Sequence, residues 1–351
     1  MRSIMRVVLI LVLSFEVVAN SSANHFSDSL RNKNIQRFPD HFFIWPVVKQ
    51  RSTSFEIENL PGKNEKLIYK PNGSVGLGWG MYLFEIGFEL TFSVSPKEST
   101  QYLYGHSRVK DLQANILGKH WGLDVFTQNY NGFYRTDKKV PPPANTPYPQ
   151  RPDISTWNTG VNGIYLFNKD KYSIRAAYNF AERQLRSGGS FLLSGTVNTF
   201  SLRADSAIYG PKYESTYGVN ADFSKLDYTT ISVAPGYAHT FVIKRFFVNS
   251  SLSIGPAQHW VYFQSTAMSK HETTLNSFID LRLAIGYNSD RFFTGINFVA
   301  QSRNIKFEQI QFTSTSSTFK MVVGYRFREF GILKKSVRDL RPFKKGKDKQ
   351  K

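Results

Sequence analysis

The chain of 351 residues contains 45 Lys and Arg against 26 Asp and Glu, which gives a formal net charge of +19, and it has no cysteine. Aromatic residues make up 15% of the sequence, whereas all hydrophobic residues together reach only 41% and the mean hydropathy is negative. The absence of cysteine excludes a disulfide-stabilised scaffold and a cysteine-anchored lipoprotein, and many aromatic with few aliphatic residues is an unusual composition for a soluble enzyme.

The first residues have the pattern of a secretory signal peptide. Met1 to Arg6 includes two arginines, Val7 to Leu13 is an unbroken apolar run, and small residues precede Ala23. This arrangement predicts a signal peptide over 1–23 that is cleaved after Ala23. The apolar run is shorter than the about 20 residues that a membrane-spanning helix needs, so we expect export without a helical anchor.

Beyond a periplasmic leader, which we place at 24–51, apolar and polar residues alternate. In a β-strand, successive side chains point to opposite faces. The segment 83–92 therefore puts one set of apolar side chains on a single face: Phe84, Ile86, Phe88, Leu90 and Phe92. Glu85 and Glu89 occupy the opposite face. The same alternation recurs in three later segments, 172–180, 279–287 and 319–327.

Tight turns and longer connections alternate along the chain, as they do in barrels of the outer membrane. Between them we predict twelve strands: Thr53 to Leu60, Leu67 to Trp79, Leu83 to Val94, Val109 to Leu117, Trp121 to Tyr134, Trp157 to Phe167, Tyr172 to Arg183, Tyr228 to Val242, Phe246 to Phe263, Thr274 to Tyr287, Phe292 to Arg303 and Thr318 to Phe327. The segment 190–203 also has a strand pattern. It either lies in an outside or luminal loop, which we prefer, or pairs with 214–223 and raises the number to fourteen.

The recurrence of the alternation and the predicted export signal together favour a membrane barrel over a soluble sheet. An Arg or Lys on the lipid face at the bilayer midplane costs about 2–4 kcal/mol, so the ionic rows must face the lumen. We therefore predict an all-β protein with a single antiparallel transmembrane β-barrel over 52–328 and a basic periplasmic tail over 329–351. A secreted β-sandwich is the alternative fold.

Three stretches resemble a family of bacterial barrels. They are Ile68 to Asn72 with Gly76, Gly78 and Gly80, then Gly189 to Gly195, and Gly236 to Lys244. In these motifs the chain is similar to the Bacteroidota outer-membrane β-barrel family catalogued as domain of unknown function 4421, over most of its mature length. The resemblance implies an outer-membrane barrel. Because the motifs mark turns and strand ends, it carries no catalytic residue across.

The charges expected to face the lumen are the most informative chemistry in the sequence. The early strands contribute Glu56, Glu58, Glu85, Glu89, Asp111 and Asp124, and the later strands contribute Arg175, Arg282, Lys320 and Arg326 together with Asp280. Pairing of the last strand with the first should bring Lys320 and Arg326 beside Glu56 and Glu58. The charges then form either ion pairs that fill the lumen or a transverse field along a solute path. Because buried charges need partners in any case, we prefer the filled lumen.

Catalytic motifs are missing from the sequence. Barrel hydrolases use Ser–His or Asp–His sets near the outer rim, and His106 and His271 lie in suitable places. No G-x-S-x-G, H-E-x-x-H or P-loop pattern accompanies them, and His120 at a turn fits an interfacial role better than metal binding. We therefore predict no enzymatic activity, no cofactor and no metal.

The sequence thus predicts a structural or accessory barrel with a charge-filled lumen in the outer membrane of a Gram-negative bacterium, with membrane lipid as its partner. One alternative is a passive pore or small-solute transporter, in which the Pro-rich loop 141–152 folds inward. A barrel hydrolase ranks lower. The tail, with Lys344, Lys345 and Lys347, is either simply solvated or attaches the protein to anionic headgroups, peptidoglycan or a periplasmic partner. Export makes nucleic acid an improbable partner.

Overall fold

The computed structural model describes residues 25–60, 66–73, 75–83, 86–94, 96–137, 142–265 and 268–328. The predicted signal peptide and the basic tail, including Lys344, Lys345 and Lys347, lie outside these ranges, as do Phe84 and Glu85. Of the helices within the described ranges, none is long and apolar enough to cross a membrane.

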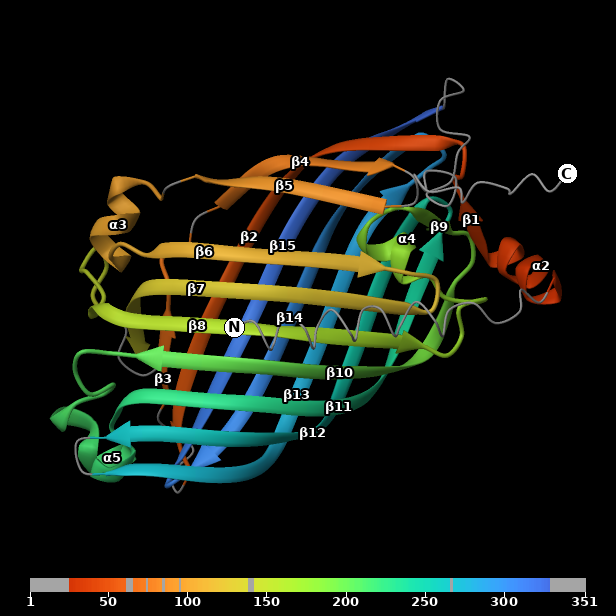
Figure 1. Cartoon of the computed structure of the whole chain (residues 1–351). Coiled ribbons are helices and arrows are strands. Elements are labelled where there is room, and N and C mark those ends of the chain that lie inside the picture. The colour runs from red at the N-terminus through yellow and green to blue at the C-terminus, as the bar shows by residue number, and fades with distance from the viewer. Residues whose placement is uncertain are drawn as a thin grey trace, which may run out of the picture.

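The molecule is a closed antiparallel β-barrel (Figure 1). Ten strands form the hydrogen-bonded ring: β2 (His41–Asn59), β3 (Lys66–Lys70), β7 (Trp121–Asp137), β8 (Gln150–Leu166), β10 (Gly188–Arg203), β11 (Phe223–Ile243), β12 (Phe246–Ser265), β13 (Ser269–Asn288), β14 (Phe292–Phe307) and β15 (Ile310–Arg328). Pairing of β15 with β2 closes the ring, from Ile310 opposite Asn59 to Arg328 opposite His41.

Three further strands lie outside the ring. They are β4 (Val75–Leu83), which pairs with β2, β5 (Ile86–Val94), which pairs with β4, and β6 (Arg108–Leu117), which pairs with β7. The predicted strand Leu67 to Trp79 is thus divided into β3 and β4, with Pro71 at the break. Since proline lacks the N–H that a ladder needs, the interruption has a local cause.

The structure corrects the prediction for residues 172–203. The predicted strand Tyr172 to Arg183 contains the short helix α4 (Ile174–Tyr178), followed by β9 (Glu182–Gln184), and the segment placed in a loop forms barrel strand β10. All five residues of α4 are buried, because this segment lies inside the barrel and has protein on every side. Its alternation therefore carried no information about a lipid face. The hydroxyl of Ser173 caps the helix by accepting a hydrogen bond from the backbone N–H of Ala176.

The barrel also begins earlier than predicted. Residues of the expected leader form the helix α2 (His25–Asn34), the short strand β1 (Ile35–Arg37) and the first half of β2. Residues 214–221 form α5 (Glu214–Tyr217) and the 3-10 turn η2 (Val219–Ala221), so they do not pair with 190–203 as a strand.

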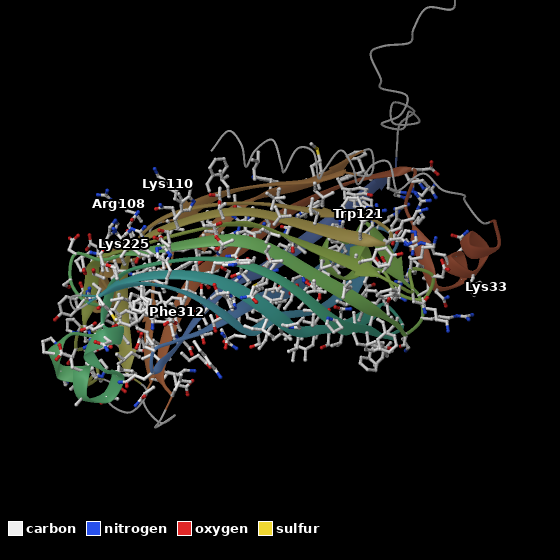
Figure 2. All side chains as sticks on the ribbon, turned by 60° about the horizontal axis from the view of Figure 1, so that its bottom comes forward. Lys33, Arg108, Lys110, Trp121, Lys225 and Phe312 are labelled. Carbon is white, nitrogen blue, oxygen red and sulfur yellow. The ribbon has the colours of Figure 1, made fainter. Side chains whose placement is uncertain are left out.

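The two ends of the barrel differ. We call the end with α2, β1 and β9 the terminal end, and the end with α3 (Glu98–Tyr104), η1 (Pro211–Tyr213) and α5 the loop end (Figure 1). Figure 2 shows Lys33 at the terminal end and Arg108, Lys110 and Lys225 at the loop end. A separate apolar cluster packs inside each end, with Phe55, Phe200 and Phe312 in the loop-end cluster.

Candidate functional site

An ion cluster crosses the middle of the lumen. Asp280 and Arg282 are two residues apart on β13, so both side chains point inward, and Asp124 comes from β7. Arg282 Nη2 lies 2.5 Å from Asp124 Oδ2, and its Nε lies 3.1 Å from Asp280 Oδ1. Four strands separate β7 from β13 in either direction around the ring, so this contact joins opposite walls.

Amides on the two strands that flank β7 extend the ion cluster. Asn162 Nδ2 donates to Asp280 Oδ2 at 3.3 Å, and Asn115 Nδ2 donates to Asp124 Oδ1 at 2.6 Å. A second crossing contact lies nearer the loop end, where Ser316 of β15 and Asn158 of β8 both donate to Gln128 Oε1, at 3.0 and 2.9 Å. Asn162 is fully buried, and Gln128 and Arg303 are each only 1% exposed, so these polar groups contact one another and not solvent.

Arg303 extends into the lumen, where a hydroxyl group and two aromatic rings contact its guanidinium. Its Nη2 donates to Thr196 Oγ1 at 3.4 Å, and its guanidinium carbon lies 5.3 Å from the ring centre of Phe278 and 5.9 Å from that of Phe126. Attraction between a cation and the faces of aromatic rings strengthens when both are removed from water. The aromatic rings of β7 and β13 therefore help to accommodate this charge.

Glu89 of β5 forms ion pairs with two lysines of the barrel wall. Lys320 Nζ lies 2.9 Å from Glu89 Oε1, and Lys49 forms an ion pair with the other carboxylate oxygen. Lys49 and Lys320 are directly opposite each other in the β2–β15 ladder. Like charges in such a position repel, so Glu89 between them stabilises the closure of the barrel. Lys320 also donates to the carbonyl of Tyr178 at 3.1 Å.

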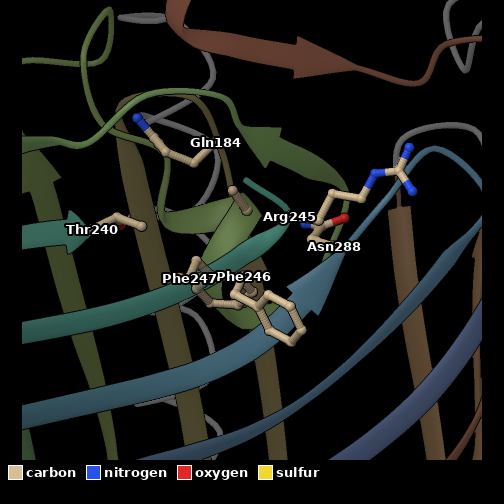
Figure 3. A pocket seen from close by; sticks show the side chains of 8 residues that line it. Gln184, Thr240, Arg245, Phe246, Phe247 and Asn288 are labelled. Atoms are coloured by element: carbon tan, nitrogen blue, oxygen red, sulfur yellow. The ribbon is translucent and has the colours of Figure 1, made fainter. Parts of the chain in front are cut away.

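The segment 172–184, which we call the inner segment, covers the lumen at the terminal end. Tyr178 donates to Asn249 Oδ1 at 2.7 Å, and Asn297 Nδ2 donates to the Tyr178 carbonyl at 3.0 Å. Arg175 bonds to the hydroxyl of Tyr82 on β4. Figure 3 shows the small cavity beside this segment, lined by Gln184, Thr240 and Phe247 among others. The inner segment is thus held to walls on several sides.

Residues 25–37, the N-terminal clip, fasten the inner segment from outside. Strand β1 pairs with β9 from Ile35 opposite Gln184 to Arg37 opposite Glu182. Arg31 Nη2 lies 2.6 Å from Glu182 Oε2, and both side chains are buried. Burial opposes ionisation of Glu182, but Arg31 and Arg175 outweigh it and hold the pKa of this carboxyl below its ordinary value.

Arg326 is buried among carbonyls and aromatic rings. It donates to the carbonyl of Phe180 at 2.7 Å and to Asn288 Oδ1 at 2.8 Å. Its guanidinium carbon lies 4.1 Å from the ring centre of Phe38 and 4.7 Å from that of Phe293. It therefore connects Phe38, which directly follows the clip, with the inner segment and β14 at the terminal end.

The loop end is covered by residues 204–222. Tyr69 donates to the carbonyl of Ile208 at 2.8 Å, and Asp222 accepts from the backbone N–H groups of Tyr209 and Gly210 at 3.0 and 2.9 Å. Ile208 and Tyr217 are fully buried in the loop-end cluster. The Pro-rich loop packs differently from the inward fold considered above, because its Tyr148 stacks on Tyr104 of α3, with ring centres 5.2 Å apart.

The predicted luminal charges are partly brought together. Lys320 pairs with Glu89 and Arg282 with Asp124 and Asp280, whereas Arg175 lies 3.6 Å from Glu182 on the inner segment and Asp111 lies 3.6 Å from Arg51. The expectation that Lys320 and Arg326 lie beside Glu56 and Glu58 is wrong. Those glutamates face Thr313 and Gln311 in the ladder, and Glu56 pairs with Lys66. Glu56 and Glu58 also alternate with the buried Phe55 and Ile57, so they lie on the outer face of β2 and not in the lumen as predicted.

The residues predicted to face lipid are only partly described. Leu90 and Phe92 are 71% and 73% exposed on the outer face of β5. Phe84 lies outside the described residues, and of Ile86 and Phe88 the structure gives the backbone strand alone. Within the described ranges, no group of three or more His, Asp or Glu side chains is arranged to hold a metal ion.

Several of the buried charges were not predicted from the sequence. Arg31, Lys49, Glu182 and Arg303 all take part in the contacts above, and none was assigned to the lumen. Lys49 lies on the same inward face of β2 as Trp45 and Val47, a signal that would have been available had the predicted strand been extended backward through Pro46. Arg31 and Glu182 are 151 residues apart in the sequence, and no local pattern around either residue predicts that they form an ion pair.

Removal of Arg282 should destabilise the barrel strongly. Arg282→Met leaves Asp124 and Asp280 as buried, uncompensated carboxylates, so we expect the free energy of unfolding in urea to fall by about 3–5 kcal/mol. Arg203→Met is the matched control, because its ion pair with Asp227 is 42% and 33% exposed and should contribute less than about 1 kcal/mol. Adding Asp124→Asn and Asp280→Asn to Arg282→Met should recover most of the loss; equal losses in Arg282→Met and the control would contradict this assignment.

Acid should release the N-terminal clip. Because the pKa of Glu182 is lowered in the folded state, its stabilising contribution is present above the ordinary glutamate pKa of about 4.3 and is lost as the pH falls through the lower folded value. The protection of residues 30–37 against hydrogen exchange, measured relative to the intrinsic exchange rate at each pH, should therefore fall in strong acid. In Glu182→Gln, exchange should already be fast at neutral pH, and Glu214→Gln at the loop end should behave as the unaltered protein. Slow exchange of Glu182→Gln at neutral pH would argue against the ion pair as the fastener.

Several bacterial proteins of known structure are weakly similar to this chain. The chain is similar to the translocator domain of the autotransporter NalP from Neisseria meningitidis, at 7% identity and a TM-score of 0.33, over 82% of this chain and 88% of that one. It is likewise similar to the beta domain of the Bordetella autotransporter BrkA, at 10% identity and a TM-score of 0.33, over 82% and 99%. OmpT of Vibrio cholerae matches at 9% identity and a TM-score of 0.24, over 82% and 97%.

No curated protein sequence matches the chain. The family model described as "Domain of unknown function (DUF4421)" matches residues 28–327, from the N-terminal clip to the end of the last barrel strand, and the chain belongs to this family.

Proposed function

We propose that the protein is a non-conducting outer-membrane barrel with a structural or accessory role in the envelope. The predicted signal peptide and the outward apolar side chains of the barrel support the location. Leu90, Phe191, Val233, Ile254 and Ile285 are all exposed on different strands. A continuous apolar outer wall suits lipid, and such a barrel satisfies its backbone hydrogen bonds internally.

The proposal places the terminal end in the periplasm. Short turns at 118–120, 244–245 and 289–291 connect strands there, and short periplasmic turns are the rule in such barrels. The membrane-embedded wall has twelve strands in this proposal, with β3 and β4 counted as one interrupted strand and β5 and β6 completing the wall. Lipid offers no partner for free backbone groups, which favours this arrangement in the bilayer.

One observation carries the proposed lack of conduction: the side chains in the middle of the lumen are shielded from solvent. Water in a pore would contact Gln128, Asn162 and Arg303, yet each is at most 1% exposed. The inner segment covers one end and residues 204–222 cover the other. Barrels of about eight strands are filled by their own side chains and barrels of sixteen or more leave a channel, and this barrel lies between the two.

Conductance in planar lipid bilayers tests this proposal. We expect the purified full-length protein to give no reproducible current steps at moderate voltage, while a porin inserted under the same conditions conducts. Regular steps of constant size would support the alternative of a pore. The purified barrel should also hydrolyse neither phospholipid nor peptide, and hydrolysis of either would favour the barrel enzyme.

For the basic tail we propose attachment to the cell wall or to a periplasmic partner. The support is its charge, since nine basic and two acidic residues lie between Gly331 and Lys351. Each basic residue near an anionic surface contributes about 1 kcal/mol. Deletion of 344–351 should therefore reduce co-sedimentation of the protein with peptidoglycan, whereas deletion of a neutral stretch of equal length outside the barrel should not. Unchanged co-sedimentation would leave the tail as a solvated extension.

A further inference from the structure

We propose that the barrel binds an anionic glycerophospholipid in a groove on its outer wall near the terminal end. The groove has a volume of about 740 Å³ and is lined by residues of β2, β4, β5, β12, β13, β14 and β15. This inference rests on the membrane placement proposed above. It adds a specific ligand class to that placement, because a groove of this kind holds one lipid in a fixed position.

Two neighbouring strands of the wall lack an inward side chain at the groove. Gly286 of β13 and Gly295 of β14 are directly opposite each other in the ladder, and both line the groove. A Cβ added to Gly295 would lie 2.7 Å from the ring of Phe180, and one added to Gly286 would lie 2.9 Å from the ring of Phe247. The two glycines thus let the wall approach the inner segment closely, and the outer surface is hollowed at the same place.

The groove is lined by apolar side chains that would contact acyl chains. Leu77 and Trp79 of β4 lie on one side, Ile285 of β13 lies on the other, and Met321 and Val323 of β15 lie between them. All five are more than a third exposed to solvent in the isolated chain. Burial of an apolar surface contributes about 25 cal/mol per Å², so acyl chains that fill the groove are held more firmly than those on a convex wall.

Positive charge lies at the terminal end of the groove. Arg245 precedes the groove residue Phe246, and its Nη1 donates to the hydroxyl of Tyr287, another groove residue, at 3.3 Å. Arg245 also lines the small cavity beside the inner segment, together with Gln184 and Thr240 (Figure 3). Arg291 is exposed on the next turn of the same end. These cations are placed to bind a phosphate at the boundary between the acyl region and water.

The nearby acid does not cancel these cations. Asp290 is paired with Arg183 at 3.3 Å and accepts a hydrogen bond from Gln36 of the clip at 3.0 Å. Arg328 at the end of β15 adds another exposed positive charge. An apolar groove beside a cationic edge matches the two parts of an anionic phospholipid, whereas a second copy of this chain would place like charges against each other.

Native mass spectrometry of the delipidated full-length protein in detergent tests the site. We expect one dimyristoyl phosphatidylglycerol per barrel, bound at least about tenfold more tightly than dimyristoyl phosphatidylcholine, because only the former has net negative charge. Arg245→Ala combined with Arg291→Ala should remove most of this preference, a loss of about tenfold or more. Equal binding of the two lipids, or no retained lipid, would overturn the proposal.

A second variant tests the groove separately from the charge. Ile296→Trp fills the groove and should weaken binding of both lipids, whereas Ile254→Trp, on an exposed outer position of β12 outside the groove, should not. Heat-modifiable migration in gels confirms that each variant is folded. Equal weakening by both tryptophans, or a dimer that forms through this face and excludes lipid, would contradict the assignment. Lipid binding is measured in detergent, so its absence would overturn the lipid site and leave the proposed non-conducting barrel untouched. Regular current steps would refute the non-conducting barrel and leave the lipid site untouched.

Discussion

The contact of Arg282 with Asp124 and Asp280 across the lumen is the constraint on which the rest of the barrel depends. Ion pairs between opposite walls fix the distance between those walls, and they must be complete because an unpaired charge in this place is costly. Gln128 and Arg303 extend the same cross-lumen bonding toward the loop end. A lumen bonded in this way has little freedom to open, which is why we interpret the charges as structure and not as a solute path.

The filled middle explains the covers at both ends. Polar side chains packed against one another are stable only while water is kept from competing for their hydrogen bonds. The inner segment and residues 204–222 provide that exclusion with apolar clusters. The inner segment needs space inside the barrel at the terminal end. The paired Gly286 and Gly295 provide it, because neither places a side chain on the inner face of the wall. The absence of these two side chains affects both surfaces of the wall. The inner surface lies close to Phe180, and the outer surface borders the groove.

Much of the wall could be predicted from local alternation, and the lumen could not. The strands from β11 to β15 were predicted because each has one row of apolar side chains on its outer face, a pattern set within the strand itself. The inner segment has the same alternation but lies among protein on all sides, so Tyr172 to Arg183 could not be told from a strand. Partners on neighbouring strands depend on register, and the pairing of β15 with β2 places Lys320 opposite Lys49 and Thr313 opposite Glu56.

The N-terminal clip implies an order of events in assembly. Its contacts come from residues 169–184 and from Asp290, which belong to the middle and late parts of the chain. The first residues of the described chain therefore cannot reach their final place until the inner segment is inside the barrel and the turn after β13 has formed. Docking of the clip thus reports that the interior has been filled correctly. A protease that cuts only the undocked clip would remove it selectively from barrels that closed with an empty terminal end.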